Sequence, residues 1–337
     1  MNLYKVCMTP ILGLDIGGAN LKAAHSDRTA RTVPFALWKH PDQLADEIAR
    51  LMAAMPSHRS IAATMTGELC DCFATKRDGV LAILRSIRAA SSNLPIHVWS
   101  IQGRFLRFDH AMEDPTSVAA ANWLALAHFV AQLFPQDTIL LIDSGSTTTD
   151  LVSINRGVVE ARALTDPGRL ASGELVYTGL RRTPLCAVLG MSVAAEFFAT
   201  MLDAYLFLGL IPEDAHDCDT ADGRPATRAC AHARLARLRC AEVEAFREAE
   251  ARHLAIQAVT VQQGHIQQAV NRVLAGRRSP SRIVLSGSGE ILGRGVVERE
   301  PAWSGLPVTS LRTVLGPALS EAACAYALAI LAQEEGE

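Results

Sequence analysis

Near its start the chain reads Ile11-Leu12-Gly13-Leu14-Asp15-Ile16-Gly17-Gly18-Ala19-Asn20-Leu21-Lys22-Ala23-Ala24. An apolar run reaches an aspartate, turns through two glycines and returns as an alternating segment, which predicts a β-hairpin. Gly17 and Gly18 place no Cβ beside the turn, so its backbone N–H groups could hold phosphate oxygens. An ordinary glycine hairpin that binds nothing is the alternative for this stretch taken alone.

The polar side chains of this hairpin suit the same ligand. Asp15 stands at the end of the first strand, where its carboxylate could hold a divalent cation such as Mg²⁺ through water. Lys22 supplies a point charge that phosphate favours. The candidate phosphate-binding residues of this hairpin are Asp15, Gly17, Gly18, Asn20 and Lys22.

The pattern returns in the second half of the chain. Residues 139–152 read Ile-Leu-Leu-Ile-Asp-Ser-Gly-Ser-Thr-Thr-Thr-Asp-Leu-Val, so Asp143 corresponds to Asp15 and Gly145 to Gly17. Two hairpins of one type predict a duplicated fold in which two similar domains face one cleft. The second hairpin adds Gly145, Ser146, Thr147 and Thr148 to the candidate phosphate site, and Asp143 as a second metal ligand.

Length and composition bound the class of protein. The chain has 337 residues, enough for two domains, and 49% of them are hydrophobic. A net charge of −3 argues against a nucleic-acid partner. No run reaches the roughly 18 apolar residues of a membrane span, and Asp15 interrupts any signal-peptide core, so we expect a cytoplasmic protein with no membrane partner. The eight cysteines lack a C-x-x-C spacing, which favours free thiols over zinc ligands.

Apolar spacing predicts an α/β fold in both halves. Expected strands lie at 31–38, 61–66, 96–100, 139–142 and 283–286, and expected helices at 41–55, 78–90, 115–133, 192–208, 229–253, 255–275 and 317–332. We therefore expect a first domain at 1–136 and a second at 137–315. The second carries a helical insertion at about 190–280, and a C-terminal helix at 316–337 packs back on the first domain.

The two Asp-x-Gly hairpins and a later Gly287-Ser288-Gly289-Glu290 turn resemble the phosphate-1, phosphate-2 and adenosine motifs of the actin/Hsp70/sugar-kinase superfamily. The resemblance covers nearly the whole chain. It implies two ribonuclease-H-like α/β domains with a ligand in the cleft between them. It also adds Gly287, Gly289 and Glu290 to the candidate nucleotide- or diphosphate-binding residues.

Longer strings resemble the hydantoinase/oxoprolinase-like branch of that superfamily. They lie at 65–80, 114–123, 173–184 and 220–224. The finer similarity is to a group linked to tetrahydromethanopterin-dependent one-carbon transfer, whose archaeal relatives are synthases of methanofuran biosynthesis. The resemblance implies a transferase that condenses 5-(aminomethyl)-3-furanmethanol diphosphate with the phenol of tyramine or γ-glutamyltyramine and releases diphosphate. In bacteria the product would feed methylofuran.

That reaction needs groups for the leaving diphosphate and for the phenol proton. Lys22 is the candidate for the first task. Glu68 is the first candidate base and Glu174 the second, although either carboxylate could instead cap a helix or pair with an arginine. Asp222, in a glycine-bearing loop, could ligate metal or simply form a turn. Candidate substrate-binding residues are Lys76, Arg77, Arg181 and Arg182 for anionic groups, and Tyr177 for stacking on a ring.

Two other functions stay open at this point. An ATP-dependent small-molecule kinase or ATPase would suit the superfamily, with ATP in place of the diphosphate substrate. A non-catalytic nucleotide-binding protein of the pathway is the second alternative. Retention of Asp15, Lys22, Asp143 and Asp150 disfavours it, because a decayed site would be free to lose them. The oligomeric state has no signal in the sequence.

Overall fold

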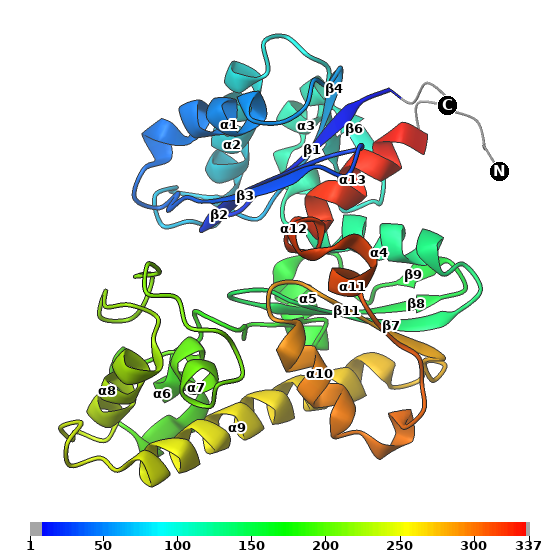
Figure 1. Cartoon of the computed structure of the whole chain (residues 1–337). Helices are drawn as coiled ribbons and strands as arrows, with labels where there is room; N and C mark the ends of the chain where they lie inside the picture. Colours follow the sequence, from blue (N-terminus) through cyan, green and yellow to red (C-terminus); the bar gives the residue numbers. More distant parts are fainter. Residues whose placement is uncertain (1–8, 335–337) are drawn as a thin grey trace.

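A computed structural model describes residues 9–334 and contains two six-stranded sheets (Figure 1). The first sheet has the order β3-β2-β1-β4-β5-β6. Its central strand β1 pairs antiparallel with β2 and parallel with β4. The strands are β1 (Ile11–Ile16), β2 (Asn20–His25), β3 (Ala30–Pro34), β4 (Ser60–Met65), β5 (Ile96–Trp99) and β6 (Phe105–Arg107).

The second sheet repeats this plan in the order β10-β8-β7-β11-β12. Its central strand β7 pairs antiparallel with β8 and parallel with β11. Both β9 and β10 pair with β8, so two short strands share the place that β3 fills in the first sheet. The strands are β7 (Thr138–Ser144), β8 (Thr149–Asn155), β9 (Val158–Glu160), β10 (Leu175–Val176), β11 (Arg282–Ser286) and β12 (Val308–Ser310).

Two helices lie between the sheets, α4 (Asn122–Leu133) and α13 (Ala323–Glu334) (Figure 1). Their buried side chains form one apolar cluster with β1, β7 and β8. The approach of α13 to β1 is so close that a Cβ on Gly13 would lie 1.8 Å from the Ala325 carbonyl oxygen. Helices α1 (Leu44–Ala53) and α2 (Lys76–Ala90) cover the opposite face of the first sheet, with α3 (Phe108–Glu113) beside them.

The second sheet carries a helical extension on its other face, drawn in green and yellow in Figure 1. It runs through α6 (Leu185–Leu189), α7 (Met201–Phe207), α8 (Arg228–Leu238) and α9 (Glu248–Leu274). The remaining helices are α5 (Asp166–Ser172), α10 (Glu290–Glu298), α11 (Leu311–Leu315) and α12 (Pro317–Glu321). Buried Gln262 of α9 connects the extension to the sheet: it accepts from Tyr205 Oη at 3.1 Å and donates to the Gly179 carbonyl at 2.9 Å.

The predicted α/β fold is confirmed, but several helix predictions were wrong in extent, and the helix expected at 317–332 is two helices, α12 and α13. The helix expected at 192–208 begins only at Met201, because Thr200 and Asp203 form a capping box there. The expected break at residue 254 falls instead between α8 and α9, where Cys240 has a φ of +53° and Arg247 caps the start of α9. The helix expected from residue 115 starts at Asn122, after Ala120 with a φ of +50°.

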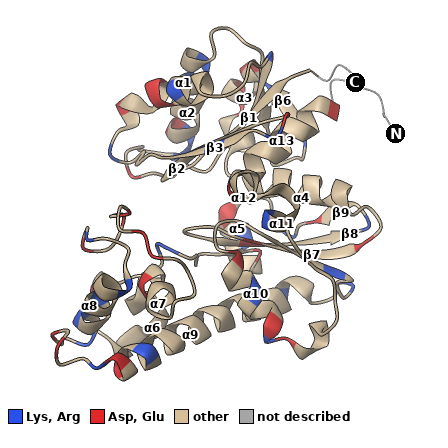
Figure 2. Ribbon diagram, in the orientation of Figure 1, with Lys and Arg blue, Asp and Glu red and all other residues tan. Residues whose placement is uncertain are grey.

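Within residues 9–334, no helix is both long and apolar enough to cross a membrane. Basic and acidic residues are interleaved over both halves of the molecule (Figure 2). A binding site for a charged ligand must therefore come from a local cluster of charge.

Candidate active site

The two glycine hairpins have the same geometry. The Gly17 N–H donates to the Asn20 carbonyl at 3.0 Å, and the Gly145 N–H donates to the Thr148 carbonyl at 2.8 Å. Side chains alternate between the faces of a strand, so Asp15 and Asp143 point from the faces on which α13 and α4 pack. The duplication thus brings the two aspartates together at one end of the layer between the sheets.

Strand register pairs each aspartate with a second charged residue. Asp15 lies opposite Lys22 in the first hairpin, whereas Asp143 lies opposite Asp150 in the second. The charge of half-buried Lys22 interacts with three carboxylates, those of Asp15, Asp143 and Glu321. Burial lowers the pKa of Lys22, but Asp15 and Asp143 raise it, and the net pKa lies above its ordinary value.

The pKa values of both aspartates are raised in this crowded site. Burial raises the pKa of Asp15, against the lowering effect of Lys22. Burial and the charge of Asp150 raise the pKa of Asp143 to about 6, although Lys22 opposes them. A cluster of buried carboxylates with raised pKa values is a frequent mark of a functional site.

Asp150 forms an ion pair with an arginine that the sequence did not point to. Arg169 of α5 approaches Asp150 to 2.8 Å, and its guanidinium carbon stacks 3.8 Å from the ring centre of Trp123. The Arg169 side chain is almost fully buried. A single arginine in a polar stretch carries no sequence signal of such a contact, because the pairing depends on how α5 returns to the sheet.

Strands β4 and β11, which pair in parallel with the central strands β1 and β7, are followed by equivalent turns. The Gly67 N–H donates to the Ile16 carbonyl at 3.1 Å, and the Gly289 N–H donates to the Ser144 carbonyl at 2.8 Å. A Cβ on Gly287 would lie 2.2 Å from the Ser144 carbonyl oxygen. Gly287 and Gly289, expected to contact ligand, are therefore explained by close approach of backbone to the second hairpin.

Glu68 is the carboxylate whose setting best suits a base. Its side chain is buried, with 1% of the residue exposed. Its Oε1 lies 3.5 Å from Lys76 Nζ. Lys76 Nζ in turn donates at 2.9 Å to Asp166 of α5, which belongs to the second half of the molecule. The other oxygen, Oε2, is buried without a hydrogen-bond partner. Burial raises the pKa of Glu68 to about 7, against the lowering effect of Lys76.

The other acidic candidates have structural contacts instead. Glu174 accepts from the backbone N–H groups of Arg162 at 2.7 Å and Ala163 at 3.1 Å, which ties down a loop. Glu290 accepts from Ser310 Oγ at 2.6 Å and the Arg312 N–H at 3.1 Å. These contacts leave neither carboxylate free to serve as base or ribose ligand.

Asp222, a candidate metal ligand in the sequence, is surrounded by guanidinium groups. Three arginines approach its carboxylate, at 2.6 Å for Arg224, 2.9 Å for Arg234 and 3.3 Å for Arg237. Although burial opposes them, the hydrogen bonds from Arg224 and Arg234 lower the pKa of Asp222 to about 2. Of the two alternatives for Asp222, the structure therefore favours the turn, because the three cations already neutralise this carboxylate.

The structure divides the basic candidates. We call each sheet with the helices that pack on it a lobe. Lys76 and Arg182 lie between the two lobes, and the guanidinium carbon of Arg182 lies 4.7 Å from the ring centre of Trp38 in the first lobe. Arg181 is tied to Asp217 at 2.6 Å, and Arg77 is exposed on α2. Tyr177 is 70% exposed. Lys76 and Arg182 are thus the members of this set that join the hairpin region.

A divalent cation fits the aspartate pair. Asp15 Oδ1 is buried with no hydrogen-bond partner, and Asp143 faces it from the second hairpin. Among the described residues no three His, Cys, Asp or Glu side chains gather as a metal site. Two carboxylates with water and phosphate oxygens are the usual surroundings of Mg²⁺.

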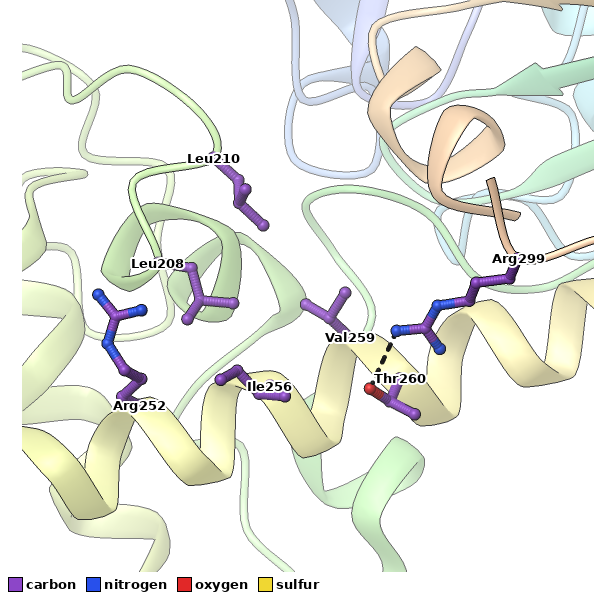
Figure 3. A pocket seen from close by; sticks show the side chains of 7 residues that line it. All are labelled: Leu208, Leu210, Arg252, Ile256, Val259, Thr260 and Arg299. Atoms are coloured by element: carbon purple, nitrogen blue, oxygen red, sulfur yellow. Dashed lines mark hydrogen bonds between the residues drawn. The ribbon is translucent and has the colours of Figure 1, made fainter. Parts of the chain in front are cut away.

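Two pockets lie elsewhere, on the helical extension and beside it. One of about 270 Å³ has an apolar floor that includes Ile256 and Val259 of α9, with Arg252 and Arg299 at its two ends (Figure 3). A wider one of about 650 Å³ surrounds His232 of α8. Neither includes a residue of the hairpins, so pocket size alone would miss the charged cluster.

The duplicated sheets and the facing hairpins define a protein of the two-domain actin-like ATPase fold. A nucleotide-free acetone carboxylase structure shares it, with a TM-score of 0.54 and 9% identity over 96% of this chain and 70% of that one. The family model of hydantoinase/oxoprolinase matches residues 59–335, and the chain belongs to that family.

Two curated relatives carry one name, (4-{4-[2-(gamma-L-glutamylamino)ethyl]phenoxymethyl}furan-2-yl)methanamine synthase. The protein from Methanocaldococcus jannaschii is 32% identical over 96% of this chain and 98% of its own length. The protein from Methanococcus vannielii is 29% identical over 62% of this chain and 96% of its own length.

Proposed function

We propose that this enzyme condenses 5-(aminomethyl)-3-furanmethanol diphosphate with the phenol of tyramine or γ-glutamyltyramine. The observation that carries the proposal is the similarity to a synthase of that furan–phenol ether over 98% of the synthase's length. The product would serve methanofuran or methylofuran biosynthesis, in a cytoplasmic pathway linked to tetrahydromethanopterin and one-carbon transfer. The charged cluster between the lobes supports the chemistry in two ways.

The first is stabilisation of the leaving group. The bond between the exocyclic carbon and the diphosphate oxygen breaks, and the electron pair leaves with diphosphate. Lys22 and the N–H groups of the two glycine turns would hold the developing negative charge, which is the term that most lowers such barriers. A bound Mg²⁺ on Asp15 and Asp143 would add positive charge there.

The second is removal of the phenol proton. A phenol has an ordinary pKa of about 10, so the attacking oxygen needs a base. Glu68, whose pKa is about 7 and whose Oε2 is free of hydrogen bonds, would take that proton. The phenol oxygen then forms the new bond to the exocyclic carbon as diphosphate departs.

A paired release assay on purified protein with Mg²⁺ tests this function. One arm holds the aminomethylfuran diphosphate with γ-glutamyltyramine or tyramine, and the other holds ATP with the same acceptors. We expect diphosphate and the ether in equal amounts in the first arm without ATP. Release of ADP or phosphate in the ATP arm alone would contradict the proposal and support a kinase or ATPase.

A further inference from the structure

One pair of side chains bridges the two lobes beside the hairpins and has no role in the chemistry above. The guanidinium carbon of Arg182 lies 4.7 Å from the ring centre of Trp38. Each partner is anchored to a different glycine turn. The N–H of Leu37, next to Trp38, donates to the Gly18 carbonyl at 2.9 Å, and the N–H of Arg182 donates to the Ser146 carbonyl at 2.9 Å.

Both anchors are rigid. Leu37 is fully buried, and the Lys39 N–H closes the turn around Trp38 by donating to Ala36 at 2.9 Å. On the other side, Gly179 packs so closely on the second hairpin that a Cβ there would lie 2.6 Å from the Thr147 nitrogen. Backbone hydrogen bonds therefore place the Trp38 and Arg182 backbones beside the two turns.

The contact between them is replaceable. Within residues 9–334, no carboxylate lies at ion-pair distance from Arg182, so its charge is balanced only by the face of the Trp38 ring and by solvent. A contact between a partly exposed cation and a ring contributes only about 0.5–1 kcal/mol. A flat ligand that offers its own ring to Trp38, and an anion to Arg182, can take its place.

We propose that Trp38 is the floor of an aromatic subsite on which the furan ring of the diphosphate substrate stacks, with Arg182 above it. This subsite rests on the proposed function, since the furan is bonded through one methylene to the diphosphate that the turns would hold. Trp38 and Arg182 belong to different lobes, so a ring enters when the lobes part by about 3.5–4 Å, the thickness of one ring in contact. The subsite should therefore bind planar rings more tightly than bulky aliphatic groups.

Tyr177, the aromatic residue that the sequence favoured for stacking, is a weaker candidate. Its side chain is 70% exposed, whereas Trp38 is half-buried beside the first turn. Trp99 and Trp123 are 2% exposed, and Trp303 lies in the apolar cluster of the extension. Trp38 is thus the tryptophan of this chain placed to meet a ligand at the hairpins.

Calorimetric titration in the presence of Mg²⁺ tests the subsite with two probes, inorganic diphosphate and the aminomethylfuran diphosphate. We expect Trp38→Ala to weaken binding of the furan compound about ten-fold and to leave inorganic diphosphate within two-fold of the wild type. Trp38→Phe should fall between. Phe197→Ala, which removes an exposed aromatic side chain on the extension, is the matched control.

The outcomes separate the subsite from the function. If Trp38→Ala binds the furan compound as the wild type does, or loses both probes equally while retaining its Tm, the subsite is wrong and the function stands. If the wild-type enzyme binds inorganic diphosphate but not the furan compound, the proposed function fails and the subsite fails with it.

Discussion

The two hairpins share one backbone but carry opposite charge patterns. In the first, Asp15 faces Lys22; in the second, Asp143 faces Asp150. The cation for the second hairpin is Arg169, which comes from α5 and is buried against Trp123. Duplication therefore supplied two equivalent turns, and divergence made Lys22 the cation that a ligand between the lobes can reach.

The segments after the parallel strands diverged in the same way. Register places Glu68 and Glu290 at equivalent positions, four residues beyond Thr64 and Ser286, the neighbours of the two aspartates. Glu290 is held by Ser310 and Arg312, whereas Glu68 keeps one buried oxygen free. Under the proposed function, the first lobe therefore supplies the reactive member of each pair, and the second supplies the structural one.

Replacing Lys22 should give the largest loss. Lys22→Met removes the cation that neutralises departing diphosphate, and we expect turnover to fall about 10³-fold. Diphosphate release under saturating substrate measures it. Lys39→Met, which removes an exposed lysine near Trp38, is the control and should retain wild-type turnover. A Lys22→Met enzyme with normal turnover would remove the functional difference between the hairpins.

Glu68→Gln should reduce turnover about 10²-fold, because the phenol loses its base. In the wild type the base is the deprotonated carboxylate, whose pKa is about 7. Activity should therefore fall as the pH drops below about 7, and this acid limb should vanish in Glu68→Gln. Rates measured between pH 5 and 9 test both points.

Glu290→Gln is the matched change in the second lobe. It weakens the hydrogen bonds to Ser310 and Arg312, so we expect the free energy of unfolding to drop by about 1 kcal/mol while turnover stays within two-fold of the wild type. Urea denaturation measures the first quantity. Equal losses of turnover in the two glutamate variants would show that the lobes share the chemistry.

The hairpins, the fold and the family could be predicted because they depend on local patterns. An apolar strand, an aspartate and a glycine turn are contiguous in sequence, and their repetition at Asp143 revealed the duplication. Glu68 could be chosen as a candidate because it directly follows a predicted strand. Its burial and its link through Lys76 to Asp166 could not, because they join residues about 90 positions apart.

The remaining residues were missed for the same reason. The contacts of Arg169 with Asp150 and of Arg182 with Trp38 join residues far apart in the sequence, and a local sequence pattern does not fix such contacts. Conversely, the sequence left open whether Gly287 and Gly289 admit a ligand or a neighbouring backbone, because both require an absent Cβ. Only the approach to Ser144 distinguishes these two causes.

Asp143→Asn should raise stability, since Asp143 has a native pKa of about 6 against 3.8 when unfolded. Between those values the native state retains a proton that the unfolded chain releases, so the free energy of unfolding falls as pH rises from 4 to 6. At pH 8 with EDTA the variant should be more stable by about 3 kcal/mol. Asp15→Asn should also gain stability, because burial raises the pKa of Asp15 as well.

The two turns should also differ in their tolerance of a methyl group. A Cβ on Gly17 would lie 2.8 Å from the Asn20 carbonyl oxygen, whereas on Gly145 the nearest atom, the Thr148 oxygen, would be 3.6 Å away. Neither glycine has a positive φ, so the contact alone decides. We expect Gly17→Ala to lower the free energy of unfolding by about 1–2 kcal/mol and Gly145→Ala to change it by under about 0.5 kcal/mol. Equal costs in urea denaturation would show that the first turn can widen as easily as the second, and that the two differ in charge only.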